Sequence, residues 1–357
     1  MKIGVEGRHV PDAQKRGPHG VLDFAEEQAL DGVFFKTLTD VSPCLDMGEL
    51  REVKAHAQER GLYFETGIGR INPYNTAESP DVRLLGKGDY LAGMETMVRA
   101  CREIGCTELW AETATWHGDF PGFFCEDRFR TDVSWPDQLE ATAKFLDNLK
   151  PVLRECGARV NIETHNEITS FEVVRLVEAI GPEFVGITFD TANVLMRGEH
   201  PLAATRRVAP YTHMTHAKDG ALYFDKQGLY RCVVPCGEGV IDWETILPLL
   251  WEYSPDLNLS IEDYWSPTPV EIFDPAWRAL HPDLTVDELC DVMRLAVEYD
   301  AKVKQGHGVD RDAYFKIKYE EVRIERLQAS VRHLRGIIAD KGLHNRTAAA
   351  PGPTTAG

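Results

Sequence analysis

The chain has no long apolar run, no paired cysteine motif and little positive charge, and each shortage excludes a class of protein. No stretch approaches the ~18 consecutive apolar residues that a membrane-spanning helix needs. The sequence opens on MKIGVEGRHV, without the charged and apolar regions of a secretory signal, and its eight cysteines include no CxxC pair. We therefore expect a cytoplasmic protein with neither a disulfide framework nor a thiolate zinc site.

Basic residues are outnumbered, with 39 Lys and Arg against 57 Asp and Glu, which gives a formal net charge of -18 at pH 7. This balance repels phosphate backbones and anionic lipid headgroups. The hydrophobic fraction of 43% and the charged fraction of 27% are those of ordinary globular proteins. We expect a soluble, folded chain whose partners are neither nucleic acid nor membrane.

Short strand-like runs alternate with longer amphipathic stretches from the first residue to about Trp265. This alternation is typical of repeated βα units and a parallel sheet. Helical patterns such as Leu91–Ile104 and Gln138–Cys156 fill the intervals, and the number of strands, eight, is the number that closes a barrel. The expected strands are Lys2–Gly7, Gly32–Thr37, Leu62–Gly69, Glu108–Ala114, Arg159–His165, Phe184–Asp190, Tyr211–Asp219 and Leu257–Tyr264.

The predicted fold class is therefore α/β, a (β/α)8 TIM barrel at residues 1–265 with a helical C-terminal extension at 266–345 and a flexible tail at 346–357. After Trp265 several prolines interrupt the pattern, and helices are expected at Thr285–Lys304 and Asp310–Lys341. The second helix carries an apolar stripe that must dock on the barrel or on another subunit, and the sequence leaves both open. The tail is rich in Ala, Pro, Thr and Gly.

Two connections are longer than usual, Arg70–Tyr90 after the third strand and Thr115–Ser134 after the fourth. Both follow the carboxyl ends of strands, which form the catalytic face of a barrel, so both can roof a pocket. In the second loop Trp116 and His117 are candidates for contact with a sugar or aromatic ring, with Phe124 nearby. Packing under their own loop is an equally common role for such residues.

Four successive strands end in an acid or an imidazole: Glu163, Asp190, His216 and Glu262. Because neighbouring strand ends converge around a barrel axis, these side chains can surround one divalent ion and leave positions open for substrate. Three carboxylates and one imidazole favour Mn²⁺ first, with Mg²⁺, Co²⁺ and Zn²⁺ as alternatives. Unrelated polar caps at the strand ends are the competing interpretation.

Other polar residues near these strand ends are candidate site residues. His165 lies two residues beyond Glu163, on the same side of the strand, and is a candidate base because a His beside a metal stays neutral more easily. A hydrogen-bonding cap is its alternative role. Asn193 could bond a sugar hydroxyl or cap a turn, and Lys218 could contact a substrate oxygen or a carboxylate. Further candidate sugar contacts are His9, Glu65 and Glu112.

These motifs resemble the xylose-isomerase-like TIM barrel superfamily, the sugar phosphate isomerase/epimerase group that also includes endonuclease-type barrels. The resemblance covers Met1 to about Trp265 and rests on the runs IETH, FDTAN and HAKD and on the loop PCGEGVIDW. It implies that the four strand-end residues are metal ligands and that Glu163 and Glu262 form an acid/base pair beside a substrate carbonyl. Asn193 stands where the multi-zinc endonuclease branch has a His, which argues against DNA repair.

The chain also resembles the catalytic alpha subunit of bacterial C-glycoside deglycosidases. The shared features are the IETH run with its second His, Asn193, the aromatic loop Trp116–Phe124 and a helical extension that could dock a small partner. The resemblance implies a carbon–carbon lyase in which His165 removes the proton next to the ketone of a 3-oxo C-glycoside and β-elimination releases a phenolic aglycone. It also implies a small beta subunit in a hetero-oligomer, with a homo-oligomer as the alternative.

Two further functions would use the same residues. A metal-dependent isomerase or epimerase of a ketose or inosose would reprotonate the same enolate at another position or face. A wide aromatic pocket would favour the lyase, whereas a small closed pocket with two poised Glu residues would favour epimerisation. A noncatalytic carbohydrate-binding subunit is the third function, and four intact ligands oppose it.

Overall fold

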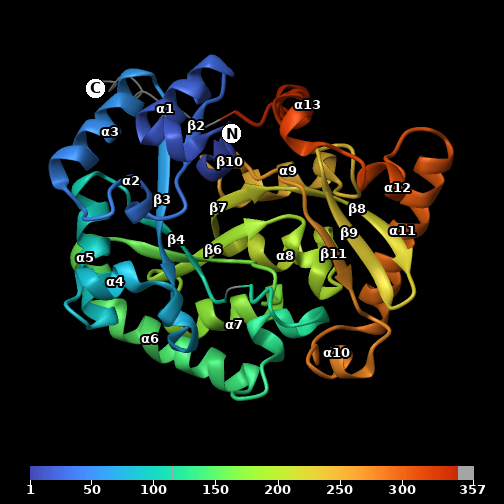
Figure 1. Cartoon of the computed structure of the whole chain (residues 1–357), viewed down its shortest axis with the longest axis horizontal. Coiled ribbons are helices and arrows are strands. Elements are labelled where there is room, and N and C mark those ends of the chain that lie inside the picture. Colours follow the sequence, from blue (N-terminus) through green and yellow to red (C-terminus); the bar gives the residue numbers. More distant parts are fainter. Residues whose placement is uncertain (115, 345–357) are drawn as a thin grey trace, which may run out of the picture.

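The barrel dominates the fold (Figure 1) of the computed structural model, which describes residues 1–114 and 116–344. Eight parallel strands close in the order β1-β10-β7-β6-β5-β4-β3-β2. Each overlaps one of the eight strands expected from the sequence, so the predicted fold class is confirmed. The strands are β1 (Lys2–Glu6), β2 (Gly32–Phe34), β3 (Tyr63–Arg70), β4 (Glu108–Glu112), β5 (Arg159–Glu163), β6 (Val185–Asp190), β7 (Thr212–Ala217) and β10 (Asn258–Ile261).

The strand register brings the polar strand ends to one level. Asp190 of β6 lies opposite His216 of β7, and His216 lies opposite Ser260 of β10. β10 then pairs with β1, the first strand of the chain, which closes the barrel. In a parallel barrel all carboxyl ends meet at one rim, so residues that end these strands share that rim.

Helices surround the barrel and bury their apolar faces against it. α6 illustrates how the sequence sets their ends: Ser134 caps its first turn by accepting a hydrogen bond from the Asp137 amide, and Gly157 ends it with a φ of 58°. The helices of the barrel are α1 (Ala13–Glu27), α2 (Leu38–Val41), α3 (Met47–Glu59), α4 (Pro80–Leu85), α5 (Tyr90–Glu103), α6 (Trp135–Cys156), α7 (Ser170–Ile180), α8 (Pro201–Val208) and α9 (Trp243–Tyr253).

A three-stranded antiparallel sheet beside the barrel was not predicted. It consists of β8 (Asp219–Asp225), β9 (Gly228–Val234) and β11 (Pro267–Val270) in the order β11-β9-β8. The predicted seventh strand is in fact divided, because β7 ends at Ala217 and β8 starts two residues later. The prolines after Trp265 suggested an irregular stretch, but β11 lies at the sheet edge, where proline is tolerated.

The C-terminal extension contains α10 (Pro275–Ala279), α11 (Val286–Lys304), α12 (Arg311–Tyr314) and α13 (Tyr319–Lys341). α11 agrees with the predicted Thr285–Lys304, but the single helix predicted at Asp310–Lys341 is wrong because four residues separate α12 from α13. The apolar stripe of α13 is buried within this chain, where the helix packs on α9 and β1. The tail predicted at 346–357 lies outside the described residues.

The cysteines of the chain form no disulfide bonds. All eight cysteines are free thiols, and six of them are buried. Among the described helices, none is long and apolar enough to cross a membrane.

Candidate metal centre

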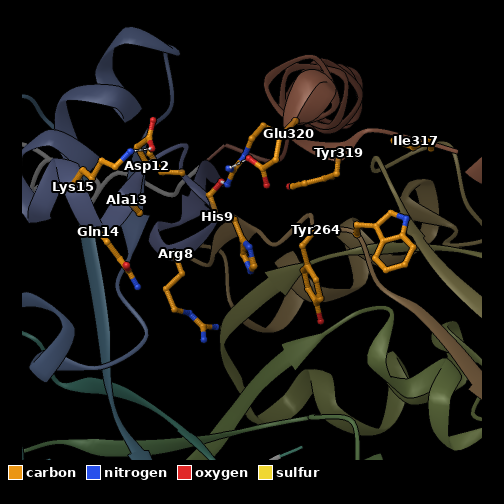
Figure 2. Close-up of a pocket in the computed structure, with 13 residues that line it drawn as sticks. Arg8, His9, Asp12, Ala13, Gln14, Lys15, Tyr264, Ile317, Tyr319 and Glu320 are labelled. Atoms are coloured by element: carbon orange, nitrogen blue, oxygen red, sulfur yellow. Dashed lines mark hydrogen bonds and ion pairs between the residues drawn. The ribbon is translucent and has the colours of Figure 1, made fainter. Parts of the chain in front are cut away.

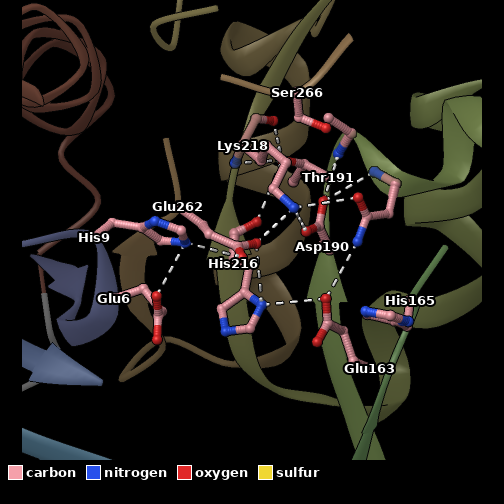
Figure 3. A network of polar contacts seen from close by, with 12 residues as sticks. Glu6, His9, Glu163, His165, Asp190, Thr191, His216, Lys218, Glu262 and Ser266 are labelled. Atoms are coloured by element: carbon pink, nitrogen blue, oxygen red, sulfur yellow. Dashed lines mark hydrogen bonds and ion pairs between the residues drawn. The ribbon is translucent and has the colours of Figure 1, made fainter. Parts of the chain in front are cut away.

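Four side chains meet at the carboxyl rim of the barrel (Figure 3). Glu163 ends β5 and Asp190 ends β6. His216 is the penultimate residue of β7, and Glu262 directly follows β10. One ligand atom from each residue lies within 4.8 Å of those of the other three, and all four side chains are buried. The residues predicted as ligands therefore form one cluster, which we call the four-ligand cluster.

The donor atoms of this cluster have few protein partners. Both ring nitrogens of His216 are buried without a hydrogen bond to the described residues, whereas Asp190 Oδ2 and Glu262 Oε2 have the Lys218 ammonium as their ion-pair partner. Two carboxylate oxygens lie near His216 Nδ1, Glu163 Oε1 at 3.3 Å and Glu262 Oε2 at 3.7 Å. Buried polar atoms without partners are costly, and a divalent cation satisfies such a set of oxygen and imidazole donors. The residues thus fit a metal.

Lys218 places a positive charge in the four-ligand cluster. Its Nζ lies 2.6 Å from Asp190 Oδ2 and 2.5 Å from Glu262 Oε2, and the side chain is buried. Burial alone would lower the pKa of Lys218, but Asp190 and Glu262 raise it well above its usual value. The ammonium therefore stays charged and offsets part of the negative charge of three carboxylates.

Two residues fix the orientation of Glu163. Asn193 Nδ2 donates to Glu163 Oε1 at 3.2 Å, while its Oδ1 accepts from Lys218 Nζ at 3.2 Å. Trp110 Nε1 donates to Glu163 Oε2 at 2.7 Å. Asn193 thus lies between a predicted ligand and a cation. Trp110 was missed by the sequence analysis, although a buried indole N–H generally needs an acceptor.

The two Glu ligands are ionised at neutral pH. Burial raises the pKa of Glu163, but His216 and His165 lower it more, to about 2. Burial also raises the pKa of Glu262, but Lys218 and the neighbouring imidazoles lower it well below its usual value. Ionised carboxylates are the form that binds a divalent cation. A carboxylate with so low a pKa is, however, a weak proton acceptor.

His165, whose side chain is half-buried, pairs with the buried carboxylate of Glu167, which the sequence analysis missed. Its Nδ1 lies 2.5 Å from Glu167 Oε2, and its Nε2 lies 3.7 Å from Glu112 Oε2. Burial lowers the pKa of His165, but Glu167 and other nearby carboxylates raise it more, to about 10. This differs from the expectation of a neutral His, which considered a metal but not Glu167. The pair resembles the carboxylate–imidazole arrangement of general bases.

His9 joins the other side of the four-ligand cluster. Its Nε2 lies 3.5 Å from Glu262 Oε1 and 3.1 Å from Glu6 Oε2. Its ring stacks on Tyr264 at 4.8 Å with an interplanar angle of 3°. Glu6 was not predicted, because only barrel closure brings β1 beside β10.

Trp116 and His117 contact residues of the same connection between β4 and α6. Trp116 forms a β-bridge with Glu126 and is 52% exposed. His117 Nε2 lies 3.0 Å from Asp127 Oδ1, and its ring lies 6.4 Å from that of Phe120. A role for Trp116 and His117 in substrate binding stays a prediction.

Comparison with known proteins agrees with this geometry. The family model described as xylose isomerase-like TIM barrel matches residues 22–294, which is most of the chain. The chain belongs to this family. The superfamily resemblance inferred from the motifs is thus confirmed, and the chain is an enzyme of this family with a carboxylate and histidine site that can hold a metal.

Curated relatives are similar over part of their length. The uncharacterized protein YihM of Escherichia coli is 27% identical over 142 residues, which span 40% of this chain and 43% of that protein. The inosose dehydratase of Lacticaseibacillus casei is 27% identical over 224 residues, which span 58% of this chain and 70% of that protein. The chain therefore covers less than half of one relative and about two thirds of the other.

Solved structures share the fold at low identity. The D-psicose 3-epimerase of Clostridium cellulolyticum has a TM-score of 0.57 at 13% identity, covering 95% of this chain and 99% of that one. The 3-keto-D-glucoside 4-epimerase of E. coli has a TM-score of 0.54 at 18% identity, covering 82% and 99%. A Mycobacterium smegmatis protein in complex with magnesium has a TM-score of 0.56 at 17% identity, covering 84% and 97%.

Proposed function

We propose that the chain is a divalent-metal-dependent carbon–carbon lyase that cleaves 3-oxo C-glycosides. The observation that carries the proposal is the four-ligand cluster with the His165–Glu167 pair beside it. The names of two similar proteins, a 3-keto-D-glucoside 4-epimerase and an inosose dehydratase, support chemistry next to a sugar or inosose carbonyl. Dehydration, like the proposed cleavage, is an elimination reaction.

Mn²⁺ is the metal we propose, with Mg²⁺, Co²⁺ and Zn²⁺ as alternatives. Glu163, Asp190, His216 and Glu262 would hold it. When bound, such an ion supplies Lewis-acid polarisation of a substrate carbonyl. Asn193 and Lys218 contact three of these residues and orient them, as partners of metal ligands commonly do.

His165 is the proposed base. Its Nδ1 is engaged by Glu167, so Nε2 can accept the proton from the carbon next to the ketone. The electron pair of that C–H bond then forms a double bond as the bond between C1 and the aglycone carbon breaks. The leaving carbon takes up a proton, and the imidazolium that His165 has become is a suitable donor. Glu167 stabilises this charged form.

An isomerase or epimerase is the second candidate, because reprotonation of the same enolate on the sugar needs the same residues. The epimerase names of two similar structures support it. We further propose a cytoplasmic setting, which the free cysteines support, and a small beta subunit as a partner, with a homo-oligomer as the alternative.

The decisive experiment is chromatographic detection of aglycone released from a 3-oxo C-glucoside by the Mn²⁺-loaded chain. It is run with and without EDTA and with and without a candidate small subunit. Chelator-sensitive release supports the lyase. No release, together with metal-dependent uptake of deuterium from D₂O into a ketohexose, would move the assignment to the isomerase. Unchanged activity in both Glu163→Gln and His216→Ala would instead favour a noncatalytic subunit.

A further inference from the structure

A cavity of about 710 Å³ lies beside the four-ligand cluster, between the barrel and the C-terminal extension (Figure 2). Three separate parts of the chain line it. They are the segment from Arg8 to Lys15 after β1, the loop after β10 with Tyr264 and Trp265, and the residues from Ile317 to Arg323 at the start of α13. None of the described residues of the aromatic loop after β4 contributes to it.

The cavity borders the cluster through His9 and Tyr264, which line the cavity and approach Glu262 and Lys218. His9 Nε2 lies 3.5 Å from Glu262 Oε1, and the Tyr264 ring lies 5.1 Å from Lys218 Nζ. The two rings stack on each other and point the same way in Figure 2. A molecule that spans the cluster and the cavity would pass along this pair of rings.

The lining of the cavity is rich in fixed aromatic surface. Trp265 is 43% exposed, yet its ring is held in place by stacking on Tyr314 at 6.3 Å with an interplanar angle of 13°. Tyr319 is held by a hydrogen bond from its hydroxyl to the Asp263 carbonyl. Rigid, partly exposed aromatic rings offer large contact area to a planar ligand at little entropic cost.

The charges of the cavity do not favour a phosphate. It contains three basic side chains, and each already has a carboxylate partner. The pairs are Arg8 with Glu6 at 2.8 Å, Lys15 with Asp12 at 3.0 Å and Arg323 with Glu320 at 2.5 Å. An anion would have to compete with these carboxylates, whereas a neutral phenolic ring would not.

We infer that this cavity is the aglycone subsite, which binds the planar phenolic ring that a C-glycoside carries on its anomeric carbon. The assignment of the sugar end to the four-ligand cluster rests on the proposed lyase function, but binding of the ring requires only the cavity. Since Tyr319 and Arg323 belong to α13, the C-terminal extension takes part in selecting the aglycone.

The test is equilibrium binding of the flavone apigenin to the full chain in EDTA, by calorimetry and tryptophan fluorescence, so that no turnover is needed. We expect one saturable site and at least a tenfold weaker affinity in Trp265→Ala, the loss of a stacking surface worth about 1.4 kcal/mol. Trp265→Phe keeps a ring and should stay within about threefold of the wild type. The matched control is Tyr253→Ala, an exposed aromatic at the end of α9, which leaves affinity unchanged. Thermal unfolding confirms that each variant is folded.

Apigenin affinity that is unchanged in Trp265→Ala, or apigenin that inorganic phosphate displaces, would overturn the inference. The lyase proposal is tested separately. If apigenin binds as expected but the 3-oxo C-glucoside of a flavone is not cleaved, the subsite stands and the lyase falls. If that substrate is cleaved with the same KM by the wild type and by Trp265→Ala, the lyase stands and the subsite is wrong.

Discussion

Glu262 directs its two carboxylate oxygens at different neighbours. Oε1 faces His9 at 3.5 Å, and Oε2 faces Lys218 at 2.5 Å. One carboxylate thus connects the four-ligand cluster with the wall of the aglycone cavity. Residues such as Lys218 and Asn193, which touch the ligands, are expected to control metal affinity through orientation.

Asn193→Ala tests this role. The change removes the amide that lies between Glu163 and Lys218, so we expect Mn²⁺ affinity to fall about 10–100-fold, the range for partners of metal ligands. Competition with a fluorescent chelator measures the affinity. The matched control is Asn148→Ala, an exposed position on α6, which should leave it unchanged. Equal affinities for both variants would show that Asn193 does not orient the ligand.

The pH dependence of turnover tests His165 as the base. Its pKa is raised to about 10, so the neutral form that accepts a proton increases as the pH rises through 10. We expect kcat/KM to rise from pH 7 towards pH 10. Glu167→Gln removes the carboxylate that raises this pKa most, so its profile should shift to lower pH. A profile with the same midpoint in both proteins would exclude His165 as the titrating base.

α13 is held on the barrel by one buried ion pair as well as by its apolar stripe. Arg326 donates two hydrogen bonds to Asp263 in the loop after β10 and a third to the Val233 carbonyl at 3.0 Å. Both charged side chains are buried. The pair therefore connects the helix to the loop that carries Glu262 and Trp265.

Asp263→Ala should lower the free energy of unfolding by about 3–5 kcal/mol, because it leaves the Arg326 guanidinium buried and unpaired. The double variant with Arg326→Met should lose less, since no buried charge then lacks a partner. Urea unfolding provides the measurement. Glu140→Ala, which breaks an exposed pair with Lys144, should change it by less than about 1 kcal/mol. A double variant less stable than Asp263→Ala would contradict this account.

The barrel strands could be predicted from short strand-like runs, and five of them, β1, β3, β4, β5 and β6, end in a charged residue. The four ligands follow from the same pattern, since they occupy matching strand ends. Contacts that depend on spatial neighbours could not be predicted: Glu6 needs barrel closure, and Trp110 needs the β4–β5 pairing. The small sheet was missed because β8 follows β7 almost directly and β11 contains two prolines.

Metal removal should destabilise the whole molecule. A ligand that binds only the folded chain stabilises it by about 2.7 kcal/mol at a concentration of 100 times its Kd. For a chain of this length we expect the Tm in EDTA to be about 4 °C lower than at that Mn²⁺ concentration. Differential scanning fluorimetry measures the shift. Glu163→Gln, which removes the charge of one ligand, should show a smaller shift in Tm. A shift equal to that of the wild type would show that Mn²⁺ binds at another site.

Closure of the barrel by β1 and β10 has a consequence for synthesis in the cell. One edge of β1 has to wait for β10, which lies from Asn258 to Ile261. At roughly 5–20 residues per second, this edge emerges from the ribosome about 10–50 s before its partner. An open strand edge invites wrong pairing during that interval. The nascent chain is therefore a natural client for chaperones until its last barrel strand has left the ribosome.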